Sequence, residues 1–180
     1  MFKKLMLATM LVAFAGVATA AEPKPRGFYI GATTGLSVFD DDGAALGTID
    51  DQDSMAQIYA GYKIFKYLAV EARYADYGGF SDSFDTLEVT AASISAVGIV
   101  PFGTSGWELF GQLGFGQVNL EIPGFVDEEE DTVTAGVGVR YSFTDLFSMA
   151  VQTDVHVWDD PSGLYTFSVG GTALAFQLNF

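Results

Sequence analysis

Two titratable side chains stand two positions apart near the end of the chain, Asp154 and His156. Residues two apart on a β-strand share a face, so this carboxylate could support the imidazole as a general base. No serine stands in a motif that would supply a nucleophile beside them. Polar groups inside proteins are mostly satisfied by ordinary hydrogen bonds. We therefore interpret the two residues as a hydrogen-bonded structural pair and predict no catalytic residue.

Carboxylates that could bind metal ions gather in three clusters, Asp40 to Asp42, Asp50 to Asp53 and a run of five. The run comprises Asp127, Glu128, Glu129, Glu130 and Asp131. Calcium and magnesium prefer oxygen ligands, but the clusters do not have the spacing of an EF-hand loop. Runs of like charge usually repel one another and stay solvated. The sequence therefore predicts acidic loops with diffuse divalent-cation binding, no defined metal site and no cofactor.

The first twenty residues have the pattern of a secretory signal peptide. Lys3 and Lys4 precede an apolar run that ends in small residues, with Ala18 and Ala20 at the expected cleavage site. The run is shorter than the roughly 20 residues of a transmembrane helix. We expect residues 1–20 to be removed and residues 21–180 to form one domain.

Composition narrows the function classes further. The formal charge is −15, which argues against a nucleic-acid partner, because such partners are bound mainly through Lys and Arg. The chain has no cysteine, so an exported protein of this sequence carries no disulfides. Backbone pairing and side-chain packing must supply its stability.

From Phe28 onward, apolar residues alternate with small or polar ones. The alternation divides the chain into eight segments, at approximately 27–39, 55–65, 68–77, 87–100, 107–120, 132–143, 147–158 and 164–180. Tilted strands that cross a membrane need about 10 residues each, and their connections are short at one end and longer at the other. The sequence thus predicts an all-β, eight-stranded antiparallel up-and-down transmembrane β-barrel with both termini in the periplasm. In the last segment the apolar phase changes, which predicts a bulge at Gly170-Gly171.

The polar face of these segments carries very few charges. They are Lys63, Glu71, Arg73, Glu108, Arg140 and Asp154. A solvent-facing surface usually contains about 25 to 35% charged residues, whereas a narrow barrel interior needs small side chains. We therefore place the polar face in the lumen and the apolar face in lipid. The six charges balance, and we expect a closed plug held by paired charges that associate into a network. Lys63 and Glu71 lie on neighbouring strands, Glu108 and Arg140 lie on adjacent strands, and Arg73 and Asp154 lie higher up.

Acidic and aromatic residues also follow the predicted topology. The four outward segments, at 40–54, 76–88, 121–132 and 159–163, contain 18 of the 23 acidic residues and no Lys or Arg. Aromatic residues should form two girdles where the strands cross the membrane interfaces. Those expected at the outer interface are Phe39, Tyr77, Phe80, Trp158 and Tyr165, and those at the inner one are Phe28, Phe65, Tyr67, Phe102, Trp107, Tyr141, Phe143, Phe147 and Phe180.

Three stretches resemble the small outer-membrane β-barrels of the OmpA transmembrane domain, OmpX and opacity surface antigen type. They are Gly27-Phe28-Tyr29-Ile30-Gly31, the hairpin from Gly61-Tyr62-Lys63 through Leu68-Ala69-Val70-Glu71, and Phe176-Gln177-Leu178-Asn179-Phe180. The last stretch is similar to the signal that such proteins show to the outer-membrane assembly machinery. The resemblance implies this role for Phe176, Leu178 and Phe180, which would also form the lipid face of the final strand.

Three function classes follow from these observations. A non-catalytic structural or surface-interaction barrel, serving envelope integrity, adhesion or as a surface antigen, comes first. A narrow porin-like conduit for small solutes is second, because eight strands enclose an interior that side chains just fill. An outer-membrane enzyme using Asp154 and His156 is third. The expected partners are outer-membrane lipid, lipopolysaccharide, the assembly machinery and divalent cations, and we expect a monomer.

Overall fold

The computed structural model describes residues 26–40, 52–81, 86–122, 126–159 and 166–180, and these residues form eight β-strands. The strands are β1 (Gly27–Asp40), β2 (Gln52–Phe65), β3 (Leu68–Ser81), β4 (Thr86–Pro101), β5 (Trp107–Ile122), β6 (Val126–Ser142), β7 (Phe147–Asp159) and β8 (Thr166–Asn179). Among the described residues, no helix is long and apolar enough to cross a membrane. The predicted signal peptide, with Ala18 and Ala20, lies outside the described residues.

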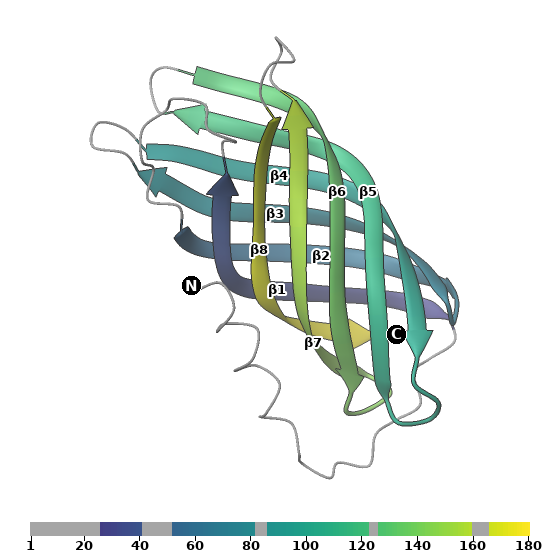
Figure 1. Ribbon diagram of the computed structural model, residues 1–180. Helices are drawn as coiled ribbons and strands as arrows, with labels where there is room; N and C mark the ends of the chain where they lie inside the picture. Colours follow the sequence, from purple (N-terminus) through teal and green to yellow (C-terminus); the bar gives the residue numbers. More distant parts are fainter. Residues whose placement is uncertain (1–25, 41–51, 82–85, 123–125, 160–165) are drawn as a thin grey trace.

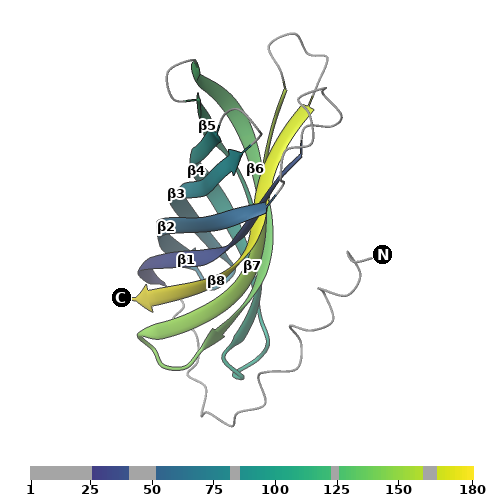
Figure 2. The same cartoon turned by 90° about the vertical axis from the view of Figure 1, so that its left-hand side faces the viewer.

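Each strand pairs antiparallel with the next, and β1 also pairs with β8, so the sheet closes into a barrel (Figure 1). The β1–β8 pairing runs from Tyr29 opposite Asn179 to Asp40 opposite Ser168. Figure 2 shows that the strands are tilted relative to the axis of the barrel. Closure removes both sheet edges, because every strand has two neighbours. The predicted all-β, eight-stranded antiparallel barrel is confirmed.

The strands alternate between the lumen and the outer surface, and the outer surface is apolar. Large exposed apolar side chains on it include Ile30, Leu36, Ile58, Val70, Ile94, Leu113, Phe115, Val133, Val137, Leu174 and Phe176. Polar and charged side chains at the opposite parity are buried inside, among them Thr33, Gln57, Ser93, Gln112, Thr134 and Gln152. This is the reverse of a water-soluble barrel, and it matches strands surrounded by lipid.

Short turns connect the strands at the end of the barrel where β8 finishes, which we call the short-turn end. Lys66 and Tyr67 alone separate β2 from β3. In the turn before β5, Gly103 and Gly106 have positive φ angles, a conformation that other residues rarely adopt. In the turn before β7, the Thr144 hydroxyl accepts hydrogen bonds from the Leu146 and Phe147 amides. These local devices hold the hairpins in register.

At the opposite end, called the far end below, several strands are longer than the sequence predicts. Residues 78–81 continue β3 and residues 126–131 begin β6, although the predicted strands were 68–77 and 132–143. The acidic run is therefore part of a ribbon, with Glu129 opposite Asn119 and Asp131 opposite Gln117. Successive strand residues point to opposite faces, so Glu129 and Asp131 share the exposed face and Glu130 points away from them.

The bulge predicted at Gly170-Gly171 is wrong. Both glycines pair in uninterrupted register with β1 and with β7. The apolar phase changes because Val169 points into the lumen, where it joins a buried apolar cluster. Register shifts occur elsewhere, between Lys63 and Phe65 and between Asp76 and Gly79.

Candidate functional site

The six charged residues predicted for the lumen all lie buried inside the barrel. They come from five strands, β2, β3, β5, β6 and β7, because each has the inward parity of its strand. Ion pairs divide them into two groups of three. The lower triad, nearer the short-turn end, comprises Lys63, Glu108 and Arg140, and the upper triad comprises Glu71, Arg73 and Asp154.

In the lower triad one carboxylate holds two cations. Glu108 Oε1 lies 3.0 Å from Lys63 Nζ, and Glu108 Oε2 lies 3.2 Å from Arg140 Nη1. The three side chains are almost completely shielded from solvent. The formal charge of the lower triad is therefore +1. In a buried environment, an uncompensated charge is strongly destabilising.

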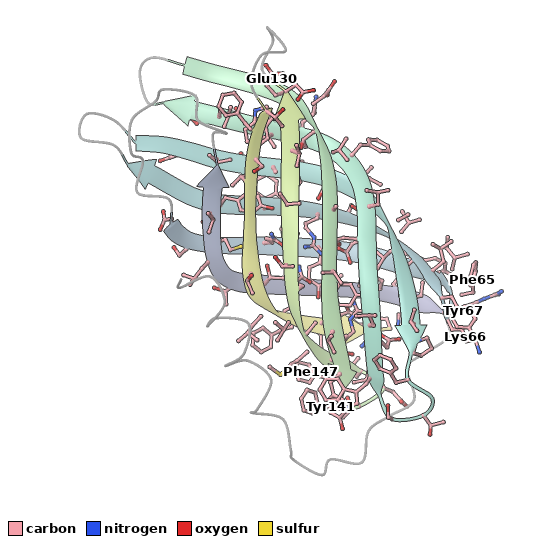
Figure 3. All side chains as sticks on the ribbon, viewed as in Figure 1. Phe65, Lys66, Tyr67, Glu130, Tyr141 and Phe147 are labelled. Carbon is pink, nitrogen blue, oxygen red and sulfur yellow. The ribbon has the colours of Figure 1, made fainter. Side chains whose placement is uncertain are left out.

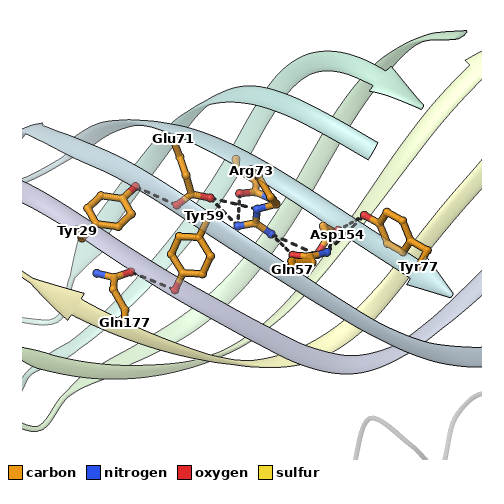
Figure 4. A network of polar contacts seen from close by, with 9 residues as sticks. Tyr29, Gln57, Tyr59, Glu71, Arg73, Tyr77, Asp154 and Gln177 are labelled. Atoms are coloured by element: carbon orange, nitrogen blue, oxygen red, sulfur yellow. Dashed lines mark hydrogen bonds and ion pairs between the residues drawn. The ribbon is translucent and has the colours of Figure 1, made fainter. Parts of the chain in front are cut away.

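In the upper triad one cation holds two carboxylates. Arg73 Nη2 lies 2.6 Å from Glu71 Oε1, and Arg73 Nη1 lies 3.5 Å from Asp154 Oδ1. Gln57 joins them, since it accepts a bond of 2.8 Å from Arg73 and donates one of 3.0 Å to Asp154 (Figure 4). The formal charge of this triad is −1, so the two triads together are neutral.

Tyrosine side chains connect the triads across the lumen. The Tyr29 hydroxyl donates to Glu71 at 3.0 Å, and the Arg140 guanidinium lies 5.9 Å from the centre of the Tyr29 ring. Arg73 lies 5.2 Å from the Tyr59 ring centre, within range of a cation–π contact. The polar groups of the lumen thus form one continuous network.

The structure brings the predicted charges together but changes one of the expected pairs. Glu108 with Arg140 and Arg73 with Asp154 form as the sequence suggested. Lys63 reaches across the lumen to Glu108, while Glu71 is held by Arg73 on its own strand. Parity along a strand tells which side chains share the lumen, but strand tilt decides which of them meet.

Sequence reasoning also missed the neutral members of the network. They are Tyr29, Gln57, Tyr59, Tyr77, Gln112 and Gln177. Each has the inward parity of its strand, and this was the signal that could have identified them.

Inward glycines give the large rings room to cross the lumen. A Cβ on Gly31 would collide with the Tyr59 ring, and one on Gly61 would collide with the Tyr29 ring. In the same way Phe110 covers Gly138. Large side chains from one strand therefore fill the space above the glycines paired with them on the neighbouring strand, so the interior is packed.

Toward the far end, the lumen becomes apolar. The buried cluster there comprises Met55, Ala75, Tyr77, Val89, Ala91, Val118, Trp158, Val169 and Ala173. Tyr77 and Trp158 were expected in the outer aromatic girdle, and this expectation is wrong. Both are buried in the lumen, like the residues two positions before them on the same strand, Ala75 and His156. The side chains of Phe39, Phe80 and Tyr165 lie outside the described part.

Asp154 and His156 share a face and are both buried in the lumen, but the hydrogen-bonded pair predicted from the sequence is wrong. The Asp154 carboxylate accepts hydrogen bonds from Tyr77 at 2.6 Å and from Gln57, and it also contacts Arg73. Neither ring nitrogen of His156 has a hydrogen-bond partner in the described part of the chain.

The far rim is acidic on its outer face. Exposed acidic residues there are Asp76, Glu88, Glu121, Glu129, Asp131 and Asp159. Glu88 of β4 stands directly opposite Glu121 of β5. No group of three or more His, Cys, Asp or Glu residues in the described part of the chain is arranged to hold a metal ion.

Asp53 organises the far rim between β2 and β3. On β2, the apolar outward positions begin at Ala56, so Asp53 lies beyond the membrane-spanning part. Its carboxylate accepts hydrogen bonds from the backbone amides of Ser54 at 2.6 Å and Gly79 at 2.7 Å. These amides favour the charged form and lower the pKa of Asp53 below 3.8. Gly79 ends the register shift in β3, so this contact fixes the bulge.

Aromatic side chains surround the short-turn end (Figure 3). Phe28, Phe65, Tyr67, Phe102 and Phe180 are exposed on the outside. Trp107, Tyr141, Phe143 and Phe147 form a row of ring contacts with neighbouring centroids 4.7 to 5.8 Å apart. The proposed assembly residues Phe176, Leu178 and Phe180 are also exposed on the lipid side of the barrel.

Comparisons with solved structures support the fold. Neisserial surface protein A aligns with a TM-score of 0.73 and 16% identity, covering 86% of this chain and 97% of that one. Ail of Yersinia pestis, solved in complex with the heparin analogue sucrose octasulfate, aligns with a TM-score of 0.63 and 17% identity, covering 87% and 100%. The outer membrane protein OprG from Pseudomonas aeruginosa aligns with a TM-score of 0.54 and 16% identity, covering 89% and 99%. Identities this low show the fold alone.

No curated protein matches the chain in sequence. A family model described as the outer membrane protein beta-barrel domain matches residues 6–171. This match covers most of the sequence and agrees with the lipid-facing exterior of the closed barrel. The chain therefore belongs to the outer membrane protein beta-barrel family, whose place is the bacterial outer membrane.

Proposed function

We propose that this protein is a non-catalytic surface barrel that serves envelope integrity or surface contact and conducts no solute. The observation that carries the proposal is the filled lumen. Two ion-paired triads occupy its lower and middle parts, and an apolar cluster closes the part above them. What remains available for interaction is the far rim, which we place outside the cell.

Conductance is the direct test of the closed lumen. A purified, folded barrel in a planar bilayer should show no steady channel at neutral pH, because a solute would have to separate buried ion pairs. As a matched control, Gln112→Gly removes a large lumen side chain without removing a charge. Steady conductance in the unmodified protein would favour a narrow solute conduit and contradict the proposal.

The chemistry of the far rim favours cationic partners. Its outer face carries Glu88, Glu121, Glu129 and Asp131, and the segments around it contain no Lys or Arg. Ail was solved with a highly sulfated ligand. We propose the opposite preference here, because like charges repel. Divalent cations would then bridge the rim to the phosphates of lipopolysaccharide.

Association with lipopolysaccharide, measured with and without a chelator, tests this partner. Calcium or magnesium should strengthen it, and a variant neutralised from Asp127 to Asp131 should lose most of the cation dependence. Asp145→Asn removes an exposed carboxylate at the short-turn end and serves as the control. If chelation changes association in neither protein, the cation bridge is wrong.

The position of β8 suggests two further partners, the outer-membrane assembly machinery and membrane lipid. We propose that Phe176, Leu178 and Phe180 are read by the outer-membrane assembly machinery and afterwards face lipid, and that the barrel works as a monomer. Phe180→Ala should slow assembly in cells while leaving refolding into detergent nearly unchanged. Equal defects in both would mean that the residue acts only in packing.

A further inference from the structure

One histidine lies in the apolar part of the lumen. His156 is the single histidine of the chain, and only 1% of its surface is exposed. Its strand neighbours at the same parity are Asp154 below and Trp158 above. The Tyr77 ring meets the imidazole edge-on, with the ring centres 5.7 Å apart.

Among the described residues, none accepts a hydrogen bond from the imidazole. Both of its nitrogens are buried and without hydrogen bonds in the described part of the chain. Asp154 is already engaged by Tyr77, Gln57 and Arg73. A neutral imidazole fits this environment, whereas an imidazolium would be a buried charge without its own acceptor.

The other groups facing this position do not change that balance. On β3, Tyr77 is neutral and Arg73 is a cation, which would repel an imidazolium. The directly paired residues are Thr134 on β6 and Val169 on β8, and neither is charged. Glu130 has the inward parity of β6, but it lies four residues from Thr134 toward the far end and is partly exposed. Val89 and Val118 provide only apolar surface from β4 and β5.

We propose that His156 is an acid-sensitive switch for the upper lumen. Protonation places a charge inside the apolar cluster, and the lowest-energy response is to let water reach the ring by separating the side chains around it. The triads below are held by ion pairs and keep the barrel closed and folded. Acid would therefore loosen the far half of the lumen and leave the short-turn half intact.

Trp158 is a built-in reporter, because it belongs to the same cluster and the chain has only one other tryptophan, Trp107. In a Trp107→Phe background, emission comes from Trp158 alone. Between about pH 8 and about pH 4.5, a range that spans ordinary histidine titration, its emission should shift to longer wavelength and acrylamide quenching should rise. Both changes should reverse when the pH is restored.

Two variants isolate the imidazole. His156→Gln keeps a polar side chain of similar reach and His156→Leu fits the apolar cluster, so at least one should fold. Both keep Asp154 and Glu130, so any response due to carboxylates would persist in them. The proposal expects the acid response of Trp158 to disappear, while heat-modifiable migration shows a folded barrel throughout.

The proposal rests on a lumen that is closed at neutral pH, but it can fail separately. An equal Trp158 response in the variants, no response in the parent protein, or complete loss of the folded barrel at acid pH would each overturn the switch. Steady conductance at neutral pH would instead overturn the proposed function.

Discussion

Tyr29 on β1 donates a hydrogen bond of 3.0 Å to Glu71 on β3, across Gly61 of the strand between them. The same ring lies beside the Arg140 guanidinium, so one side chain touches both triads. The lower triad has an excess positive charge and the upper triad an excess negative one. Neutrality is therefore a property of the whole network, and removing any single charge should disturb both halves.

Glu108 is the charge whose loss should matter most. Glu108→Ala leaves Lys63 and Arg140 without their shared carboxylate, and breaking a buried pair typically costs about 3 to 5 kcal/mol. Arg140→Ala should cost less, because Glu108 keeps Lys63. Urea unfolding of the folded barrel in detergent micelles measures both losses. In the double variant the loss should be smaller than the sum, and strictly additive losses would show that the pair is not coupled.

Positions on the outer surface should respond to charge according to their height along the barrel. Val137 lies on the outer face in the middle of β6 and is half exposed. Val137→Arg should lower the free energy of unfolding in lipid by about 2 to 4 kcal/mol. Gln117→Arg, on the outer face of β5 opposite Asp131, should be tolerated. Similar losses at the two positions, measured in liposomes, would mean that the lipid boundary is misplaced.

Two glycines of opposite parity offer a test of lumen packing. Gly61→Ala forces the Tyr29 ring to move, and such overpacking costs about 1 to 3 kcal/mol. Gly98→Ala faces outward, where the nearest atom to a new Cβ is 3.9 Å away. This change should leave stability unchanged or raise it by about 0.4 to 1 kcal/mol, because alanine restricts the unfolded chain. Equal effects in urea unfolding would argue against the assigned faces.

Protonation of Asp53 in acid should weaken its hydrogen bonds to β2 and β3 at the far rim. Backbone amides lower the pKa of this carboxyl in the folded state, so its stabilisation is fully present above its ordinary pKa of 3.8. The stabilisation is lost as the pH falls through the lowered value. Hydrogen-exchange protection of the Ser54 and Gly79 amides should decrease over that acid range. Asp53→Asn should show weaker protection without this pH dependence, and an identical acid profile would remove Asp53 as the cause.

Strand positions followed from the sequence because alternation is a direct consequence of strand geometry. In β6, the odd-numbered residues from Val133 to Val139 face lipid. The even-numbered residues from Thr134 to Arg140 face the lumen, as their spacing indicated. The rule failed where lumen residues are themselves apolar. Val169 and Trp158 have inward parity but hydrophobic side chains, so a pattern based on polarity suggested a bulge and a girdle instead.

The lumen charges were identifiable for the same reason, but their partners were not. Lys63 and Glu71 face inward from adjacent strands, and this proximity suggested a pair. The tilt of the barrel instead brings Lys63 to Glu108, three strands away. Likewise the charge of Asp127 to Asp131 indicated a loop, although pairing with β5 supplies backbone hydrogen bonds that outweigh the like charges.

The pairing of β1 with β8 also governs how this barrel folds. Tyr29 and Asn179 lie at nearly opposite ends of the domain sequence, so bringing them together carries a large loop-closure entropy. Contacts of such long range slow folding, and until they form β1 presents an unpaired edge. Within lipid, unpaired backbone groups are strongly unfavourable. A folding intermediate in which β1 and β8 are not yet paired is therefore unstable. We therefore expect the pairing of β1 with β8 to limit the rate of folding.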